Sequence, residues 1–382
     1  MRRSTSRSRH PNPITLCYEL DAHADAAAGR SPRQFYAKVY RDGASALAAT
    51  DPSTVHLPAL DMVLWPWPAD PGLPQLPALL DPAQARRFWD GPAHSVQSLR
   101  YVPEGRATLR YSRPARDSSV QQLFVKTFSD ERGSEIHRRF MHFWRQARLD
   151  AQAPTVAEPL VYDAGLRAFW QDEAVGVPLM QQLGAAPCPG WLPRKVAAAW
   201  AALHAAPAEL AGPAPRSRAH WLAEVARRSR KIARAAPELA ERAARLAQTI
   251  ERSSQQLHEP APTLIHGDCH PDQLWVDGRR IVLFDFDEFA LGDPMEDLAA
   301  FGTKLDQSGV DARFAVTMLA EYASLASHRF SLPRLRWHMA VQQLLQASRA
   351  FVFQIADWRA ELERRLERAQ ALADTCTERC CA

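Results

Sequence analysis

Three side chains within one stretch of the sequence have the types and spacing that phosphoryl transfer requires. Asp268 lies in the polar segment HGDCHPDQ, Gln273 follows five residues later, and Asp285 comes after a short apolar run. Phosphoryl transfer asks a protein for little covalent chemistry and for much positioning of charge. A carboxylate such as Asp268 can receive the proton of an acceptor hydroxyl. The amide oxygen of Gln273 and the carboxylate of Asp285 suit Mg²⁺.

A predicted β-hairpin positions these side chains. The segments 274–276 and 281–284 are apolar and β-prone, and a tight Asp-Gly turn at 277–278 joins them. Such a hairpin can hold Asp268 at one end and Asp285 at the other. The pattern therefore predicts that both carboxylates point into one space.

The paired segments HGDCHPDQ and LFDFDEFALGDPMEDLA resemble the aminoglycoside phosphotransferase and choline kinase family, small-molecule kinases of the protein-kinase-like fold. The resemblance runs from about Ser95 into the C-terminal half. It implies an ATP-dependent and Mg²⁺-dependent enzyme in which Asp268 is the base and Gln273 and Asp285 hold the metal. Most of the family has Asn where this chain has Gln273, which offers the same amide oxygen on an arm one methylene longer.

The resemblance also assigns supporting roles around the loop. It implies that His266 supports the loop backbone and that Asp297 accepts hydrogen bonds from the amides of the catalytic loop. A plain acid in the first turn of a helix is the alternative for Asp297. For Asp287 two readings stay open, a contact to the metal ligands or a position facing solvent.

The nucleotide is expected to bind in the preceding β-rich region. Lys126, on the third predicted strand, is the expected phosphate lysine, and Glu135 on the following helix is its expected ion-pair partner, with Glu131 as competitor. Adenine is expected to pair with backbone groups at the predicted hinge, which comprises Asp172, Glu173 and Ala174.

A short internal repeat offers a second candidate lysine. QFYAKVYRD (34–42) aligns with QLFVKTFSD (122–130), which places Lys38 and Lys126 in matching positions 88 residues apart. Only Lys126 is followed by a hinge-like segment, so it is the preferred one. Neither a Walker A sequence nor a GxGxxG loop is present, and the turn PEGR (103–106) is the nearest candidate for a phosphate-covering loop.

These patterns predict an α+β, protein-kinase-like fold with a small antiparallel β lobe and a large, mainly helical lobe. The small lobe combines a three-strand meander, a helix at about 134–149 and two further strands. The Pro-rich passage 64–82 is predicted to lack regular structure, to lie over another surface and to act as a linker. The predicted divisions are an N-terminal extension with a possible strand repeat (1–94), the small lobe (95–175), the helical lobe with the catalytic loop 264–301 (176–373) and a frayed tail (374–382).

Composition excludes several function classes. The net charge of +4 is mild and the arginines are scattered, which argues against nucleic acid as a partner. No apolar run approaches the roughly 18 residues that a membrane span needs. The basic start lacks the apolar core of a secretory signal, and residues 1–13 are expected to be disordered.

The six cysteines form no disulfide framework, and reduced thiols in the cytoplasm are expected. The crowded segment HGDCH suggests a zinc site, but the sequence shows no candidate for the distant third ligand that catalytic zinc needs.

The partner expected on this basis is a small-molecule hydroxyl acceptor, while the oligomeric state stays open. Residues 306–360 contain four acids against six arginines, which is a poor match for a polycationic acceptor. A neutral, sugar-like acceptor is therefore favoured. The rival hypothesis is a catalytically silent, kinase-like module that binds a nucleotide or a partner.

Overall fold

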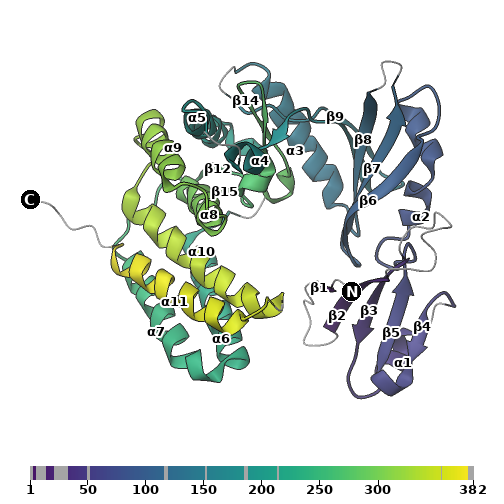
Figure 1. The fold of residues 1–382 in the computed structure, drawn as a ribbon, viewed down its shortest axis with the longest axis horizontal. Helices are drawn as coiled ribbons and strands as arrows, with labels where there is room; N and C mark the ends of the chain where they lie inside the picture. The colour runs from purple at the N-terminus through teal and green to yellow at the C-terminus, as the bar shows by residue number, and fades with distance from the viewer. Residues whose placement is uncertain are drawn as a thin grey trace, which may run out of the picture. The chain divides into compact units, whose positions relative to one another are not determined.

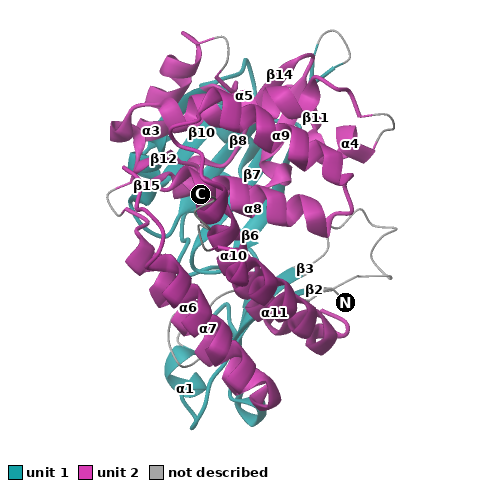
Figure 2. Cartoon of the chain, turned by 90° about the vertical axis from the view of Figure 1, so that its left-hand side faces the viewer, with its two compact units in different colours: residues 1–137, 159–173 teal, residues 138–158, 174–382 magenta. Residues whose placement is uncertain are grey.

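The computed structural model describes residues 3–5, 14–20, 33–49, 52–115, 119–150, 153–184, 188–212, 215–353 and 355–376 (Figure 1). The chain divides into two compact units, 1–137 with 159–173 and 138–158 with 174–382 (Figure 2). The first unit holds two antiparallel sheets, and the second holds most of the helices. Among the described residues, no helix combines the length and the apolar character needed to cross a bilayer.

The N-terminal sheet is antiparallel with five strands. In spatial order they are β1 (Arg3–Thr5), β2 (Ile14–Leu20), β3 (Arg33–Val39), β5 (Met62–Pro66) and β4 (Val55–Leu57). A short helix, α1 (Ser45–Ala48), follows the third strand. Strand β1 shows that residues 3–5 are ordered, contrary to expectation, because they pair with β2; the rest of 1–13 lies outside the described residues.

The second sheet repeats this order. Its strands are β6 (Ser95–Val102), β7 (Arg106–Pro114), β8 (Val120–Phe128), β10 (Ala168–Asp172) and β9 (Pro159–Asp163). Helix α3 (Arg132–Ala147) follows its third strand, as α1 follows β3. The predicted meander, the two later strands and the intervening helix are confirmed.

The Pro-rich passage is part of this structure, so the prediction that it lacks regular structure is wrong. It contains the last three residues of β5 and helix α2 (Leu76–Leu79), and a 3₁₀ segment at Pro82–Arg87 follows. Proline is tolerated here because one ends a strand and another occupies the first turn of α2, where the missing N–H would have no helical partner. Leu79 is fully buried against Leu109 and Trp170 of the second sheet.

The two faces of the second sheet have different roles. Side chains alternate along β7 and β8, so that Leu109 and Val125 face the core beneath the Pro-rich passage. Lys126 points to the opposite face, where it is flanked in register by Thr108 and Phe169. Helix α3 lies on this second face, since the ring of His137 is 6.1 Å from that of Phe169.

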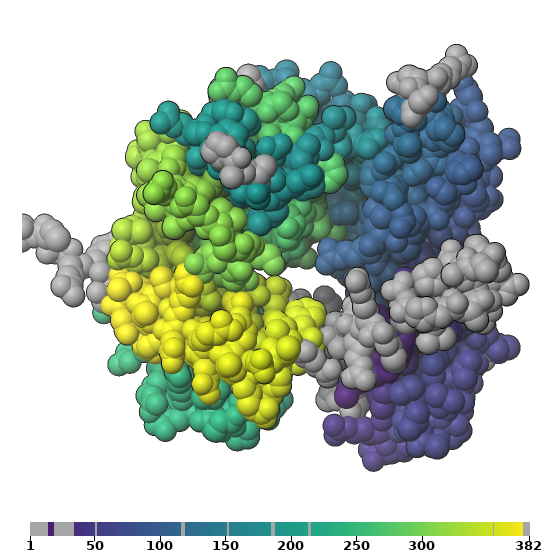
Figure 3. All heavy atoms as spheres, in the orientation of Figure 1, coloured from purple at the N-terminus to yellow at the C-terminus, as the bar shows by residue number. Residues whose placement is uncertain are grey.

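The second unit is mainly helical. Besides residues 138–147 of α3, its helices are α4 (Leu179–Gly184), α5 (Leu192–Ala205), α6 (Arg218–Ala235), α7 (Ala240–Ser254), α8 (Pro294–Gln307), α9 (Ala312–Leu325), α10 (Leu332–Val352) and α11 (Trp358–Asp374). Helices α6, α7, α10 and α11 share one core around Ile232, Leu246 and Leu344. The last helix, α11, lies on the surface of this unit (Figure 3). The predicted tail is packed at its start, because Cys376 is buried in the same core, whereas residues 377–382 lie outside the described residues.

Short strands complete the second unit. A three-stranded sheet has the order β11 (Val177–Pro178), β13 (Leu274–Asp277) and β14 (Arg280–Leu283). A second pair joins β12 (Thr263–Ile265) to β15 (Ala290–Gly292).

We expect Leu79→Ala to lower the free energy of unfolding by about 2–5 kcal/mol, because it leaves a cavity in a fully buried cluster. Leu47→Ala is the matched control, since Leu47 on α1 is 85% exposed and its truncation should change the value by less than about 0.5 kcal/mol. Urea denaturation measures both. Equal, small effects would show that the Pro-rich passage is not part of the core.

Candidate active site

The predicted hairpin is present in the second unit. Strands β13 and β14 pair antiparallel, with Leu274 opposite Leu283, and the turn contains Gly278 at a φ of +57°. The amide of Phe284 donates to the carbonyl of Gln273 at 3.0 Å. This bond closes the base of the hairpin, so the residues just before β13 and just after β14 become neighbours.

The two predicted metal ligands meet at this base. The amide nitrogen of Gln273 lies 3.4 Å from a carboxylate oxygen of Asp285 and 3.1 Å from Nε2 of His270. A half-turn of the amide exchanges its nitrogen and oxygen, which brings Oε1 to Asp285 and lets His270 donate to the amide. Burial holds the pKa of His270 below its ordinary value. A neutral imidazole suits either orientation of the amide.

This pair fits Mg²⁺ rather than a metal held by the protein alone. Mg²⁺ is usually bound by one or two protein oxygen ligands together with water and substrate phosphates. Gln273 and Asp285 supply one amide oxygen and one carboxylate. Across the described residues, no group of three or more His, Cys, Asp or Glu side chains is arranged to hold a metal ion.

The backbone of Asp285 has an unusual conformation. Its φ of 64° and ψ of 74° are left-handed, which costs a non-glycine residue on the order of 1–3 kcal/mol. The residue after it, Phe286, starts a 3₁₀ turn (Phe286–Glu288) and stacks on Phe140 at 4.5 Å between ring centroids. Packing of Phe286 thus holds the conformation that aims Asp285 toward Gln273. Asp287, in the same turn, is half-buried.

Asp268 lies on a loop whose shape depends on glycine. Gly267 has a φ of +79°, and a Cβ there would meet the carbonyl oxygen of Glu288 at 2.3 Å. Asp268 itself is half-buried, and among the described residues its carboxylate has no hydrogen-bond partner. A carboxylate in this state is able to accept a proton from a substrate hydroxyl.

Asp297 on α8 holds the same loop from beneath. Its carboxylate accepts hydrogen bonds from the amides of His266, at 2.6 Å, and Gly267, at 2.9 Å. The imidazole of His266 bonds in turn to the carbonyl of Phe284 at 2.8 Å. The structure therefore joins His266, Asp297 and the end of β14 into one support for the loop.

Two residues that the sequence analysis missed complete this support. His204 on α5 bonds to Asp297 at 3.1 Å through Nε2 and to the hydroxyl of Tyr322 on α9 at 2.8 Å through Nδ1. Burial raises the pKa of Asp297, but the hydrogen bond from His204 and the loop amides outweigh it and leave the pKa below its ordinary value. Neither His204 nor Tyr322 stands in a motif, so no local signal pointed to them.

A second group of residues that the sequence motifs did not indicate holds the backbone carbonyl of Gly267 in the loop. Arg216 donates to the carbonyl of Gly267 and to Glu296 at 2.8 Å, and it reaches Glu288 at 3.0 Å. The indole N–H of Trp221 donates to the other oxygen of Glu296 at 3.0 Å. Glu296 is only 2% exposed, and its burial raises its pKa to about 7 although Arg216 pulls the pKa down.

The expected nucleotide residues lie in the first unit. Lys126 is half-buried, with its ammonium 6.0 Å from the ring centroid of Phe169, and Glu135 lies in the first turn of α3 on the same sheet face. The competing Glu131 accepts a hydrogen bond from the hydroxyl of Tyr162 at 3.0 Å. This contact directs Glu131 toward β9 and leaves Glu135 as the better candidate to pair with Lys126.

The expected hinge residues follow one another at the end of β10. Asp172 ends that strand, and its carboxylate accepts a hydrogen bond from the amide of Glu173 at 2.8 Å. Ala174 is buried and begins the longer section of the second unit.

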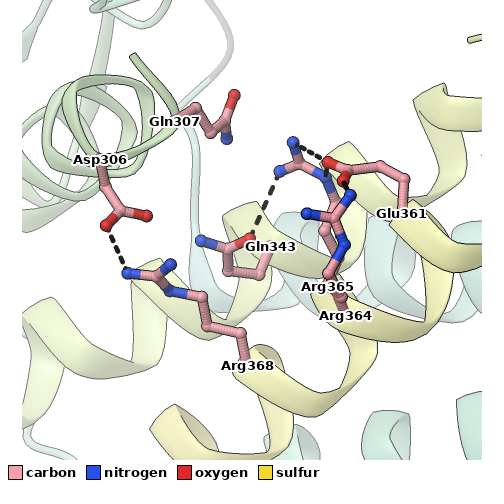
Figure 4. A pocket seen from close by; sticks show the side chains of 7 residues that line it. All are labelled: Asp306, Gln307, Gln343, Glu361, Arg364, Arg365 and Arg368. Carbon is pink, nitrogen blue, oxygen red and sulfur yellow. Dashed lines mark hydrogen bonds and ion pairs between the residues drawn. The ribbon is translucent and has the colours of Figure 1, made fainter. Parts of the chain in front are cut away.

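A separate cavity of about 310 Å³ lies among α8, α10 and α11 (Figure 4). Its lining comprises Asp306, Gln307, Gln343, Glu361, Arg364, Arg365 and Arg368. Arg368 pairs with Asp306 at 2.6 Å, and Arg364 and Arg365 both pair with Glu361. Because its arginines already have carboxylate partners and it contains no residue of the loop 264–301, we assign it no chemistry.

One protein-family model matches more than half of the chain. The model of the phosphotransferase enzyme family matches residues 98–338. No curated protein sequence matches the chain.

Solved structures share its fold. A choline/ethanolamine kinase family protein from Mesorhizobium loti is 14% identical with a TM-score of 0.50, covering 75% of this chain and 90% of that one. The aminoglycoside phosphotransferase APH(2'')-Ib with ADP is 14% identical with a TM-score of 0.51, covering 76% and 97%. A thermostable mutant of APH(4)-Ia with ADP and hygromycin B is 15% identical with a TM-score of 0.53, covering 76% and 96%. These likenesses confirm the predicted α+β, protein-kinase-like fold.

The buried Glu296 predicts a dependence of stability on pH. Its pKa is about 7 in the folded protein against an ordinary value of 4.5, so the folded state keeps a proton that the unfolded chain releases. The stabilisation that this proton gives is complete below pH 4.5 and is lost as the pH rises through 7. Relative to wild type, Glu296→Gln should therefore gain about 3 kcal/mol of unfolding free energy between those pH values.

Urea denaturation of both proteins at pH 4.5, 6 and 8 measures this difference. Glu363→Gln is the control, because Glu363 is exposed on α11 and its removal should leave the pH profile unchanged. Parallel profiles for wild type and Glu296→Gln would contradict the assignment.

Proposed function

Because the chain belongs to the phosphotransferase enzyme family, we propose that it transfers the γ-phosphoryl group of ATP to a hydroxyl group of a small molecule. The observation that carries this proposal is the meeting of Gln273 and Asp285 at the base of the hairpin, on the same loop system as Asp268. The family match covers this entire region, since residues 98–338 include it.

In the proposed reaction, Asp268 orients the acceptor hydroxyl and takes its proton. The hydroxyl oxygen forms a bond to the γ-phosphorus while the bond from that phosphorus to the β,γ-bridging oxygen breaks, and ADP leaves with the bond's electron pair. Gln273 and Asp285 are the residues that would hold Mg²⁺, which when bound would neutralise charge on the phosphates. The supports from Asp297 and Arg216 keep the loop from moving as the proton is transferred.

Lys126 is proposed to bind the nucleotide phosphates, with Glu135 as its partner and backbone groups at Asp172, Glu173 and Ala174 next to the adenine. Neighbouring structures contain ADP or AMP-PNP, which supports a nucleotide as the phosphoryl donor. Four free thiols, which are those of Cys17, Cys188, Cys269 and Cys376, support a reducing, cytoplasmic location for this activity.

The proposed acceptor is a neutral, sugar-like compound. Neighbouring structures hold hygromycin B, kanamycin or gentamicin, so hydroxyl-rich ring compounds fit this fold. Polycations require a surplus of carboxylates, and residues 306–360 have four acids against six arginines. Of the aromatic residues in that range, Phe314, Tyr322 and Trp337 are buried in the core, whereas Phe353 is 55% exposed and free to contact a ring.

A nucleotide-binding module without turnover is the alternative, and the orientation of the Gln273 amide bears on it. Only the orientation that turns Oε1 toward Asp285 supplies a metal ligand. With the amide nitrogen toward Asp285, the metal site has one oxygen ligand fewer. ATP turnover that requires Mg²⁺ and disappears in Asp268→Asn separates the two functions.

Asp268→Asn should reduce turnover by about 10² to 10⁴, the usual contribution of a positioned base, while ADP binding survives. Asp277→Asn is the matched control, because Asp277 is the exposed last residue of β13, next to the turn of the same hairpin, and its substitution should leave turnover unchanged. A panel of hydroxyl compounds with labelled ATP supplies the acceptor, and calorimetry measures ADP. Full turnover in Asp268→Asn would disprove the mechanism.

Gln273→Ala should raise the Mg²⁺ concentration needed for half-maximal turnover or abolish turnover, since it removes a metal ligand. Gln273→Asn should be tolerated, because it keeps the amide oxygen on a shorter arm. Gln255→Ala, at an exposed site after α7, is the control. A magnesium titration that is the same in all three variants would show that Asp285 alone holds the ion.

A further inference from the structure

The turn between β6 and β7, residues 103–105, is held by the side chains of the N-terminal sheet. Glu104 has a left-handed φ of 54°, and its carboxylate forms an ion pair with the ammonium of Lys38. The hydroxyl of Tyr36 donates to the same carboxylate at 3.3 Å. Both partners lie on β3, so one strand of the N-terminal sheet holds the tip of the turn.

The backbone of the turn is fixed by the Pro-rich passage. Asp70, which is 4% exposed, accepts hydrogen bonds from the amide of Glu104 at 2.8 Å and from the hydroxyl of Tyr101 at 2.7 Å. A Cβ on Gly72 would lie 2.5 Å from the Cα of Glu104, so only glycine allows this approach. The turn is therefore anchored through both its side chain and its main chain.

The place of Lys38 in its own sheet matches that of Lys126. Both sheets have the same strand order, and each lysine lies on the third strand opposite a threonine, Thr15 for Lys38 and Thr108 for Lys126. Lys38 is bound to Glu104, so its charge is not available to a phosphate group. The repeated strand unit thus has a different role in each sheet.

The turn at residues 103–105 is directly connected to the strands that flank Lys126. Strand β7 leaves the turn at Arg106, opposite Phe128, and reaches Thr108, which lies opposite Lys126. The carbonyl of Gly105 also accepts a hydrogen bond from the amide of Ser129 at 2.9 Å. A shift of the turn would consequently displace the backbone on either side of Lys126.

We propose that Lys38 is a positioning residue: through its ion pair with Glu104, the N-terminal sheet holds the β6–β7 turn in place and thereby sets the affinity for the nucleotide. The nucleotide part rests on the proposed function, whereas the hold on the turn does not. Lys38 acts through Glu104 and touches no substrate. Its role therefore affects KM for ATP and leaves kcat at saturating ATP unchanged.

The experiment compares Lys38→Met, Glu104→Gln and their double variant with the swapped pair Lys38→Glu, Glu104→Lys. Each single variant should weaken ADP binding about three- to tenfold, the effect of losing one partly buried charged hydrogen bond. The double variant should be no worse than either single one, and the swapped pair should recover part of the affinity. Hydrogen exchange of residues 100–108 should accelerate in the single variants.

Arg41→Met is the control, because Arg41 is exposed just after β3 and should change neither exchange nor ADP affinity. Lys126→Ala should abolish or greatly weaken ADP binding. This larger loss would distinguish a residue that contacts the phosphates, Lys126, from one that positions the turn, Lys38. Unchanged exchange at the turn in Lys38→Met would overturn the proposal, as would faster exchange with unaltered ADP affinity. A wild type that binds no ADP would instead refute the proposed function, and exchange at the turn would still decide whether Lys38 holds it.

Discussion

The buried carboxylate of Asp297 is the constraint on which the candidate active site depends. A carboxylate that is 1% exposed is costly unless it is hydrogen-bonded, and here it accepts from two loop amides and contacts His204. The amides belong to His266 and Gly267, so satisfying this charge fixes the loop immediately before Asp268. The position of the proposed base is therefore decided by a residue in a helix nearly thirty positions later.

The proposed metal ligands, Gln273 and Asp285, are positioned by a different kind of interaction. The hydrogen bond from Phe284 to Gln273 closes the hairpin, while the ring of Phe286 packs on Phe140 and at 4.9 Å from Phe289. Aromatic packing of this type contributes energy beyond area burial and offsets the left-handed backbone of Asp285. Local backbone pairing and core packing together hold Asp285 in a conformation that it would not adopt in an isolated turn.

The two sheets of the first unit differ in what surrounds their third strands. Two sheets with the same strand order lie in one unit, but only the second has a long helix after its third strand. In the N-terminal sheet, Lys38 is bound to Glu104, and Tyr36 stacks on Trp65 with ring centroids 4.9 Å apart. Through the contacts of Lys38 and Tyr36 with Glu104, that sheet meets a turn of its neighbour.

The sequence by itself determined the features that arise from neighbours along the chain. The hairpin, its turn and the grouping of Asp268, Gln273 and Asp285 within 18 residues follow from local alternation and turn chemistry, which need no tertiary information. The helices of the second unit can likewise be predicted from the sequence, because their apolar residues recur at helical spacing. The regular structure of the Pro-rich passage cannot be predicted from the sequence. Its short elements form because they pack against a sheet, and not because of their intrinsic helix or strand propensity.

Only the tertiary structure decided which distant residues meet. His204 reaches Asp297 from α5, Tyr322 reaches His204 from α9, and Arg216 reaches Gly267 from the segment before α6. None of these three carries a spacing signal, because helix packing for His204 and Tyr322, and backbone pairing with β15 for Arg216, bring them to the loop rather than sequence separation. The ion pair of Lys38 with Glu104 likewise joins residues 66 positions apart, and it exists because two sheets of one unit pack side by side. Residue types and local periodicity thus determined what chemistry the chain can perform, while burial and packing decided which side chains hold that chemistry in place.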